Sequence, residues 1–338
     1  MTRTHLHRNH GCRTHGFIGV LTLVVVLAAC GETDRASTIQ SARTPADRVA
    51  LIRTTTGVAG VLEGTANVVW SLDRAVAAAD GSAVFSTEID GTLTRNDPWT
   101  GDALDSWPIG LGLTPVVVAP GGDRVVVSDR PAGYDSVAAA RERTHLGVRN
   151  GKTGEVMHDL EVAADIEPEA FSLDATQLFV LDHRGDHYRV QTLDLPSGER
   201  ADVIGNDKKP AEDMRGRPIH GVLSADGSLL STLYINPENP DEPAFVHVLN
   251  LEGWSYCVDL PAEFAQGPTR SQSIERTDSD HIIVRAPAID RAARIDLDAT
   301  ALGAGTAVTL DPTAGVPADA PYRAVTNFVA LITVRAAP

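Results

Sequence analysis

Cysteine, basic residues and catalytic sequence motifs are all scarce in this chain, and each shortage excludes a class of protein. Three Cys in 338 residues cannot build a disulfide scaffold. Lys and Arg together number 29 against 45 Asp and Glu, and the resulting charge of −16 argues against a general nucleic-acid binder, which needs positive charge facing phosphates. No P-loop, GxSxG or HExxH motif is present, so no common catalytic template applies.

What is present first is an export signal. Residues 1–16 are basic and contain no acid, and an almost unbroken apolar run follows from Phe17 to Ala29. A basic segment before an apolar run of 7–15 residues is typical of a secretory signal peptide, and the run is too short for a permanent membrane span, which needs about 20 residues.

The apolar run ends in Leu27-Ala28-Ala29-Cys30, which resembles the lipobox of bacterial lipoproteins. The resemblance implies that residues 1–29 are removed and that the Cys30 thiol carries diacylglycerol. We therefore expect a flexible tether over residues 31–48, a folded domain over 49–338, and a bacterial membrane location with the protein lipid-anchored on the extracytoplasmic face. The remaining Cys257 lies in an alternating segment and is expected to be a buried structural thiol.

The body of the chain contains a repeat marked by two kinds of turn. An acidic or glycine turn precedes an apolar strand at five places, which begin near Asp80, Asp123, Asp174, Asp226 and Asp278, roughly every 50 residues. A later strand in each unit ends in Asn or Asp before a Gly-containing turn, as in residues 92–102 and 146–155. Each unit therefore reads as four antiparallel strands, which predicts an all-β, β-propeller fold.

The "DGSxL" and "N/DxxTGE" patterns of residues 73–310 resemble the YVTN-like, YncE-like and quinoprotein-like propellers, which are related to the WD-type repeat. The resemblance implies the fold and leaves the function open, because propellers carry many chemistries. Lys152–Glu155 matches the quinoprotein turn without the Trp docking pattern of that family, and no cofactor is expected.

The number of blades is expected to be six, with seven as the alternative. Five units are explicit, and a sixth is expected to join both ends of the chain, with two strands from residues 324–334 and the rest from residues 58–72. Such a joint blade closes the ring and removes open sheet edges.

The connections between strands predict a working face. We label the four strands of each unit a to d in chain order. The turns that join a to b and c to d are short, whereas several connections from b to c and from d to the next unit's a are long. These two kinds of connection lie on opposite faces of a propeller. The long connections are residues 129–144, 202–218, 236–243, 263–270 and 311–321. Two polar clusters fall in this part of the chain, and their candidate binding residues are His183, Asp186, His187, Lys208, Lys209, Arg215, Arg217 and His220.

The function that follows is a monomeric scaffold that binds a protein or cell-envelope polymer through the long-connection face, with the membrane as its anchor. No metal site or catalytic residue is assigned. The alternative is a lactonase, lyase or quinoprotein-like propeller enzyme with a site in the central channel, and His183, His187, His220 and His281 converging there would favour it.

Overall fold

The computed structural model describes residues 48–130, 141–185, 187–205, 213–224, 226–236, 239, 241–265, 272–276, 281–286, 289–297, 308–310 and 328–336. The predicted signal peptide, Cys30 and the predicted tether up to residue 47 lie outside these residues, and the first strand begins at Arg48. No helix in the described ranges is long and apolar enough to cross a membrane.

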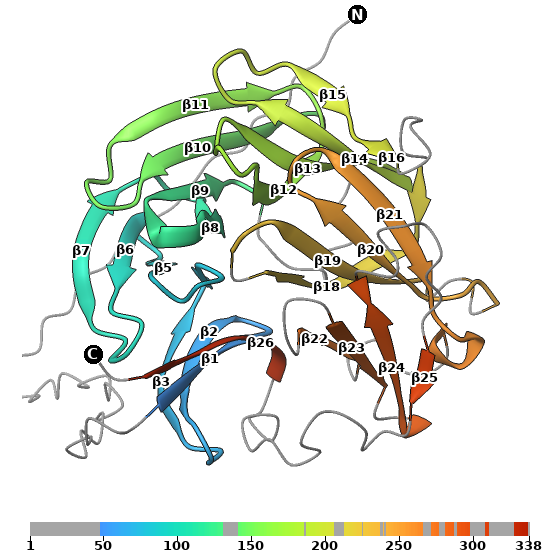
Figure 1. The fold of residues 1–338 in the computed structure, drawn as a ribbon. Coiled ribbons are helices and arrows are strands. Elements are labelled where there is room, and N and C mark those ends of the chain that lie inside the picture. Colours follow the sequence, from blue (N-terminus) through green and yellow to red (C-terminus); the bar gives the residue numbers. More distant parts are fainter. Residues whose placement is uncertain are drawn as a thin grey trace, which may run out of the picture. The chain divides into compact units, whose positions relative to one another are not determined.

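Six sheets of four or five strands surround a centre and form a six-bladed β-propeller (Figure 1). From its inner to its outer edge, blade 1 contains β26 (Phe328–Ala336), β1 (Arg48–Thr54), β2 (Gly57–Leu62) and β3 (Val68–Asp73). In the same direction, blade 2 contains β4 (Ala75–Ala77), β5 (Val84–Thr87), β6 (Thr92–Asn96) and β7 (Ala103–Pro108). Blade 3 contains β8 (Thr114–Val118), β9 (Arg124–Ser128), β10 (Thr144–Asn150) and β11 (Val156–Val162).

The second half of the ring is less regular at its outer edges. Blade 4 contains β12 (Ile166–Phe171), β13 (Gln177–Arg184), β14 (His187–Asp194) and β15 (Arg200–Asp202), with β17 (Met214–Arg215) also paired to β14. Blade 5 contains β18 (Arg217–Leu223), β19 (Leu229–Ile235), β20 (Phe245–Asn250), β21 (Trp254–Asp259) and β16 (Ile204–Gly205). Blade 6 contains β22 (Ser273–Arg276), β23 (His281–Ala286), β24 (Arg291–Asp296) and β25 (Val308–Leu310). Two short 3₁₀ turns, η1 (Pro120–Gly122) and η2 (Ala262–Ala265), complete the described elements.

The structure confirms six blades and the closure of the ring by both ends of the chain. The expected number of strands that each terminus contributes to the joint blade is wrong. The C-terminus contributes the single inner strand β26, and the N-terminus contributes the other three strands of blade 1. Residues 324–334 suggested two strands because the apolar alternation is interrupted. The pairing of β26 with β1 has two register shifts, at Leu51/Ile52 and at Arg53/Thr54, and bulges of this kind break the alternation within one strand.

The repeated turns form for local reasons. In the a–b turns the carboxylate of Asp80 accepts a hydrogen bond from the Ser82 amide at 2.9 Å, and Asp226 accepts one from the Ser228 amide at 3.0 Å. In the c–d turns Asn150 accepts from the Lys152 amide at 2.9 Å. Side chains that bond to the backbone two residues ahead stabilise the turn itself, which is why these positions could be recognised in the sequence.

Trp side chains join neighbouring blades at two of the c–d turns. A Cβ at Gly154, where φ is +70°, would lie 2.1 Å from the ring of Trp107 in the preceding blade. A Cβ at Gly101 would lie 2.7 Å from Trp70, whose indole N–H also donates to the Trp99 carbonyl at 3.0 Å. The turn Lys152–Glu155, expected to lack the Trp docking pattern, therefore does pack against a Trp ring of the preceding blade.

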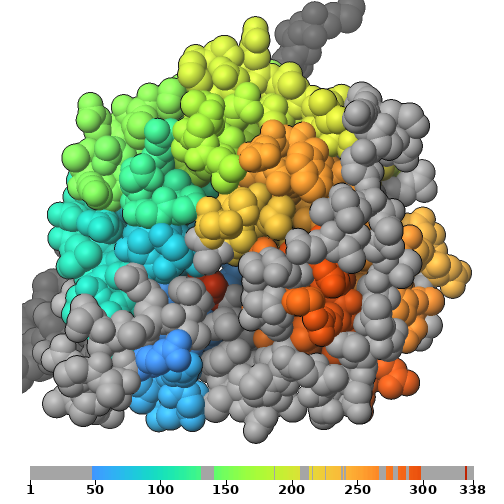
Figure 2. Space-filling view, viewed as in Figure 1, coloured from blue at the N-terminus to red at the C-terminus, as the bar shows by residue number. Residues whose placement is uncertain are grey.

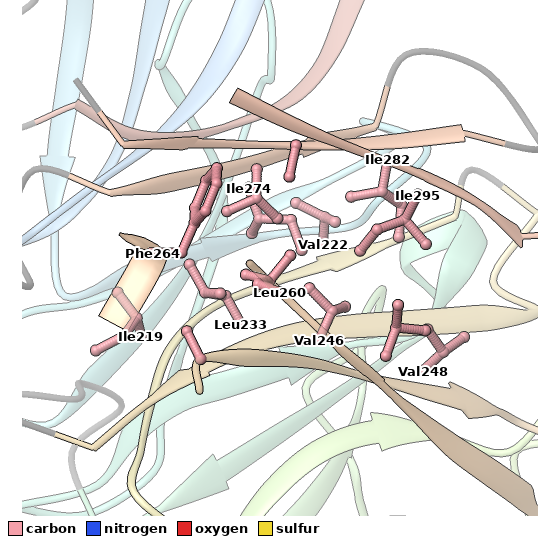
Figure 3. Close-up of a cluster of buried hydrophobic side chains, with 14 of the residues drawn as sticks. Ile219, Val222, Leu233, Val246, Val248, Leu260, Phe264, Ile274, Ile282 and Ile295 are labelled. Carbon is pink, nitrogen blue, oxygen red and sulfur yellow. The ribbon is translucent and has the colours of Figure 1, made fainter. Parts of the chain in front are cut away.

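The hydrophobic core lies between adjacent blades. Figure 3 shows the cluster between blades 5 and 6, in which side chains from the facing strands interdigitate. The labelled residues are Ile219, Val222, Leu233, Val246, Val248, Leu260, Phe264, Ile274, Ile282 and Ile295. Burying each aliphatic side chain of this size contributes about 1.5–3 kcal/mol, so blade-to-blade packing is the main source of stability.

Three inner strands share one local device. Each has Pro near its start, as the second residue of β8 and β18 (Pro115 and Pro218) and the third of β12 (Pro168), and each pairing shifts register immediately afterwards. The extra residues are Val116, Glu169 and Ile219. Proline fits an inner strand because one edge of that strand faces the channel and needs no ladder donor, and a bulge turns the side chain of the extra residue to a new direction.

Candidate functional site at the channel mouth

The two faces of the propeller differ in the length of their connections, as the repeat predicts, although some connections on the expected long face are short. The b–c and d–a connections share one face, which we call the b–c/d–a face, and the connections after β9 and β19 are long. The connection after β5 in blade 2 and the one at Gly185–Asp186 in blade 4 are short. The stretch 202–218 is not a plain loop, because β16 pairs with blade 5 and β17 pairs with blade 4.

Four charged or polar side chains meet on this face where strands of blades 3 and 4 begin or end. Arg130 follows β9, Asp165 precedes β12, Glu167 lies in β12 and His183 lies near the end of β13. We call these four residues the mouth cluster. They come together because the second strand of a blade ends on the same face on which the first strand of a blade begins.

The contacts of the mouth cluster are close and mostly shielded from water. Arg130 forms an ion pair with Asp165, and the two residues are only 6% and 5% exposed. Arg130 Nε also lies 3.5 Å from Glu167 Oε2, and His183 Nε2 lies 3.2 Å from the same oxygen. Burial lowers the pKa of Arg130 and the Glu167 carboxylate opposes that shift, so the guanidinium depends on its acidic partners for compensation.

Glu169 extends this cluster along β12. Burial and the neighbouring Glu167 carboxylate raise the pKa of Glu169 to about 8, while Arg53 and a hydrogen bond with Thr232 act in the opposite direction. At neutral pH the protonated carboxylic acid is therefore favoured, and it can donate a hydrogen bond. Arg53 belongs to blade 1 and Thr232 to blade 5, so the environment of this one acid is built by three blades.

His220, on β18, is a further, partly buried titratable group on an inner strand. Burial and the charge of Arg53 lower the pKa of His220 to about 3, although a hydrogen bond with the Gln272 backbone opposes the shift. The imidazole is therefore neutral at physiological pH. Figure 2 shows a small red patch, from the described part of β26, recessed near the centre of the face in view. A protonated carboxylic acid and a neutral imidazole can each donate and accept hydrogen bonds.

The structure separates the predicted binding residues. His183 pairs with Tyr188 and Arg184 pairs with His187 across the β13–β14 hairpin, so the two His side chains lie on opposite faces of the sheet. They therefore cannot hold one metal ion together. Within the described ranges, no group of three or more His, Cys, Asp or Glu residues is placed to hold a metal ion.

The other predicted residues have different positions from those expected of one loop. Arg217 and His220 belong to the inner strand β18, and the backbone of Arg215 pairs with His187. Asp186, Lys208 and Lys209 lie outside the described residues. His281 begins β23 on the a–b side of blade 6, 3.8 Å from Asp296, and so does not join His183 and His220.

Sequence reasoning missed most of the mouth cluster. Arg130, Asp165 and Glu167 had no motif around them, because Arg130 follows β9 and lies 35 residues before Asp165, whereas Asp165 and Glu167 stand at the start of β12. The one usable signal was the pair of acids in Glu167-Pro168-Glu169, which interrupts an otherwise apolar strand. The buried thiol predicted for Cys257 is also wrong, since Cys257 lies exposed on the outer strand β21 of blade 5.

Comparisons with known proteins add likeness in fold only. No family model matches the chain, and no curated protein matches it in sequence. Among solved structures, hydrazine synthase of Kuenenia stuttgartiensis is 14% identical with a TM-score of 0.46, over 82% of this chain and 79% of that one. TolB of Acinetobacter baumannii is 14% identical with a TM-score of 0.42, over 74% of this chain and 60% of that one.

A third similar structure is the dihydro-heme d1 dehydrogenase NirN in complex with DHE, which is 16% identical with a TM-score of 0.43, over 82% of this chain and 66% of that one. This chain therefore spans less than two thirds of the TolB and NirN chains. Since all three TM-scores lie below 0.5, the propeller assignment rests on the six sheets themselves, and no function is transferred.

Proposed function

We propose that this protein is a lipid-anchored propeller on the extracytoplasmic side of a bacterial membrane, which binds a protein or envelope polymer through its b–c/d–a face. The anchor is supported by the sequence from the basic N-terminus to Cys30. The binding role is supported by one observation above all, the mouth cluster together with Glu169.

The mouth cluster supports binding because stability alone does not favour it. Taking an ion pair such as Arg130–Asp165 out of water costs several kcal/mol per ion, and apolar side chains of similar volume are often as stabilising. The neutral form favoured for Glu169 adds a second unusual group beside it. Shielded charges and shifted pKa values of this kind concentrate at functional sites.

A second function, a propeller enzyme, is favoured by one feature. An acid with a pKa of about 8 is suited to general acid catalysis near neutral pH, and His220 lies in the same electrostatic environment of Arg53. The two functions differ in their response to Glu169→Gln. An enzyme would lose turnover about 100-fold or more, whereas a binding protein has no turnover to lose.

The lipid anchor is tested by feeding producing cells a fatty acid with an alkyne group and following the label on the full chain. We expect labelling and membrane fractionation of the wild type, and loss of both in Cys30→Ala. Cys257→Ala is the matched control and should be labelled like the wild type. Unlabelled wild-type protein would refute the anchor.

The binding face is tested with a photo-cross-linking residue in producing cells. Glu142 and Asp241 are exposed on the b–c/d–a face, and Lys152 and Glu252 are exposed in c–d turns on the opposite face. We expect a common cross-linked partner from the first pair and none from the second. A partner captured only from Lys152 and Glu252 would show that the partner binds the opposite face, and would refute the proposed binding face.

A further inference from the structure

Two neighbouring loops of blade 2 expose aliphatic side chains on the b–c/d–a face. Ile89, in the b–c turn of residues 88–91, is 88% exposed, and Leu111, in the d–a connection of residues 109–113, is 78% exposed. The other exposed large hydrophobic residues of the described chain reach at most 51%. We call these two loops, with Ile89 and Leu111, the apolar knob.

The first loop of the knob is fixed by its own backbone. Gly91 N donates to the Glu88 carbonyl at 3.1 Å, and Glu88 N donates to the Thr92 carbonyl at 3.0 Å. The Asp90 carboxylate accepts from the Thr92 amide at 3.0 Å. These bonds close a tight turn that leaves Ile89 at its tip, with Gly91 in the left-handed region at φ +81°.

The second loop is held against the first. Ile109 N donates to the Gly91 carbonyl at 2.9 Å, and a Cβ at Gly91 would lie only 2.5 Å from the Gly110 carbonyl oxygen. Ile109 and Leu113 are buried on either side of Leu111, so the loop is anchored at both ends while Leu111 points outward. The backbones of the two loops are therefore held by hydrogen bonds, so only the exposed side chains need ordering on binding.

Nothing in the fold requires aliphatic residues at these tips. Turn positions favour Asn, Asp, Gly, Ser and Pro, and leaving Ile or Leu in water forgoes the burial energy of a large side chain. Exposed Glu88 and Asp90 flank Ile89 on both sides. A partner must therefore offer an apolar pocket with positive charge at its rim.

We infer that the apolar knob inserts into an apolar pocket of a partner protein whose rim carries Lys or Arg. This inference rests on the proposed function, because it assigns the partner's contact to one part of the b–c/d–a face. A partner protein is favoured over a lipid surface because Glu88 and Asp90, on a chain with a net charge of −16, are repelled by anionic headgroups.

The test uses the full chain in its producing cells, with the photo-cross-linking residue at position 89, 111 or 173. Leu173, 51% exposed in the a–b turn of blade 4, is the control on the opposite face. We expect positions 89 and 111 to capture the same protein, with the cross-linked segment, mapped by mass spectrometry, containing apolar residues beside Lys or Arg. Position 173 should not capture it.

The captured protein is then purified and its affinity for the full chain is measured. We expect the double variant Ile89→Asp/Leu111→Asp to bind about tenfold more weakly or worse, and Leu173→Asp to bind like the wild type. Glu88→Lys/Asp90→Lys should also weaken binding and reduce its dependence on salt. Unchanged affinity in the first double variant overturns the inference.

The remaining outcomes are decisive as well. Cross-links from positions 89 and 111 to lipid, to a second copy of this chain, or to an acidic segment overturn the inference. If Glu142 and Asp241 capture a partner that positions 89 and 111 do not, the inference fails while the proposed function stands. If no position on this face captures anything, both fail.

Discussion

The buried pair Arg130–Asp165 is the feature of the channel mouth whose removal should be felt most strongly. It connects the end of β9 in blade 3 to the start of β12 in blade 4. Replacing Arg130 by Met leaves Asp165 with the Arg141 amide at 3.3 Å, and leaves Glu167 with His183 at 3.2 Å. Neither contact supplies a full positive charge, since His183 is charged only when protonated.

The expected cost follows from the burial of both partners. Because Arg130 is 6% and Asp165 5% exposed, Arg130→Met should lower the free energy of unfolding by about 3–5 kcal/mol, the range for a buried pair that loses one member. Asp165→Asn should cost less, about 2 kcal/mol, because Arg130 keeps Glu167 at 3.5 Å. The double variant Arg130→Met/Asp165→Leu removes both charges and should be less damaging than Arg130→Met alone.

Urea denaturation at pH 7, followed by Trp fluorescence, measures the free energy of unfolding of each variant. The matched control is Arg143→Met, which breaks an exposed ion pair with Glu161 at 3.2 Å and should cost about 0–1 kcal/mol. If Arg130→Met lowers the free energy of unfolding no more than Arg143→Met does, the Arg130–Asp165 pair is solvated and the reasoning about desolvation is wrong.

Three further predictions concern other parts of the fold. Because the pKa of Glu169 is raised to about 8 in the folded state, this group's contribution to stability falls as the pH rises from its unfolded value through 8. Glu169→Gln should therefore flatten the fall in urea midpoint between pH 5 and 9, and an unchanged slope would exclude the raised pKa. Deleting residues 328–338 removes β26 and leaves the edge of β1 open, so we expect loss of cooperative unfolding and aggregation in light scattering. Gly154→Ala should cost about 1–3 kcal/mol in urea denaturation because the methyl meets Trp107, whereas Gly121→Ala, with a similar φ of +82° and nothing within 4 Å, isolates the smaller backbone cost.

The sequence predicted those parts of the fold that depend on nearby residues. A turn such as Asp226–Ser228 carries its own stabilising hydrogen bonds within three residues, so each blade left a local signal that could be counted. The composition of blade 1 depends instead on contacts between residues such as Arg48 and Ala336, at opposite ends of the chain. No local pattern states how many strands each terminus supplies.

The sequence could predict which face of the propeller carries the candidate site, but not which residues form it. His183 was found because of its unusual neighbours in sequence, but the side chain that it contacts is Glu167, which the pairing of β13 with β12 brings to it. Lys208 and Lys209 attracted attention as rare cations, although the structure builds its described charged site around Arg130. Clusters formed by strand ends of different blades have no common sequence spacing.

The inner strands show that Glu169 in blade 4 is an acid where the neighbouring blades have apolar residues. The extra residue after the inner-strand Pro is Val116 in blade 3 and Ile219 in blade 5, both buried and apolar, whereas in blade 4 it is Glu169. The bulge itself is therefore a shared structural device, and an acid at this position is what distinguishes blade 4. The charges of Glu167 and of Arg53 in blade 1 both act on the pKa of Glu169, in opposite directions. Substitutions at this bulge should then alter binding more than the fold, because Val and Ile are accepted at the same place in the neighbouring blades.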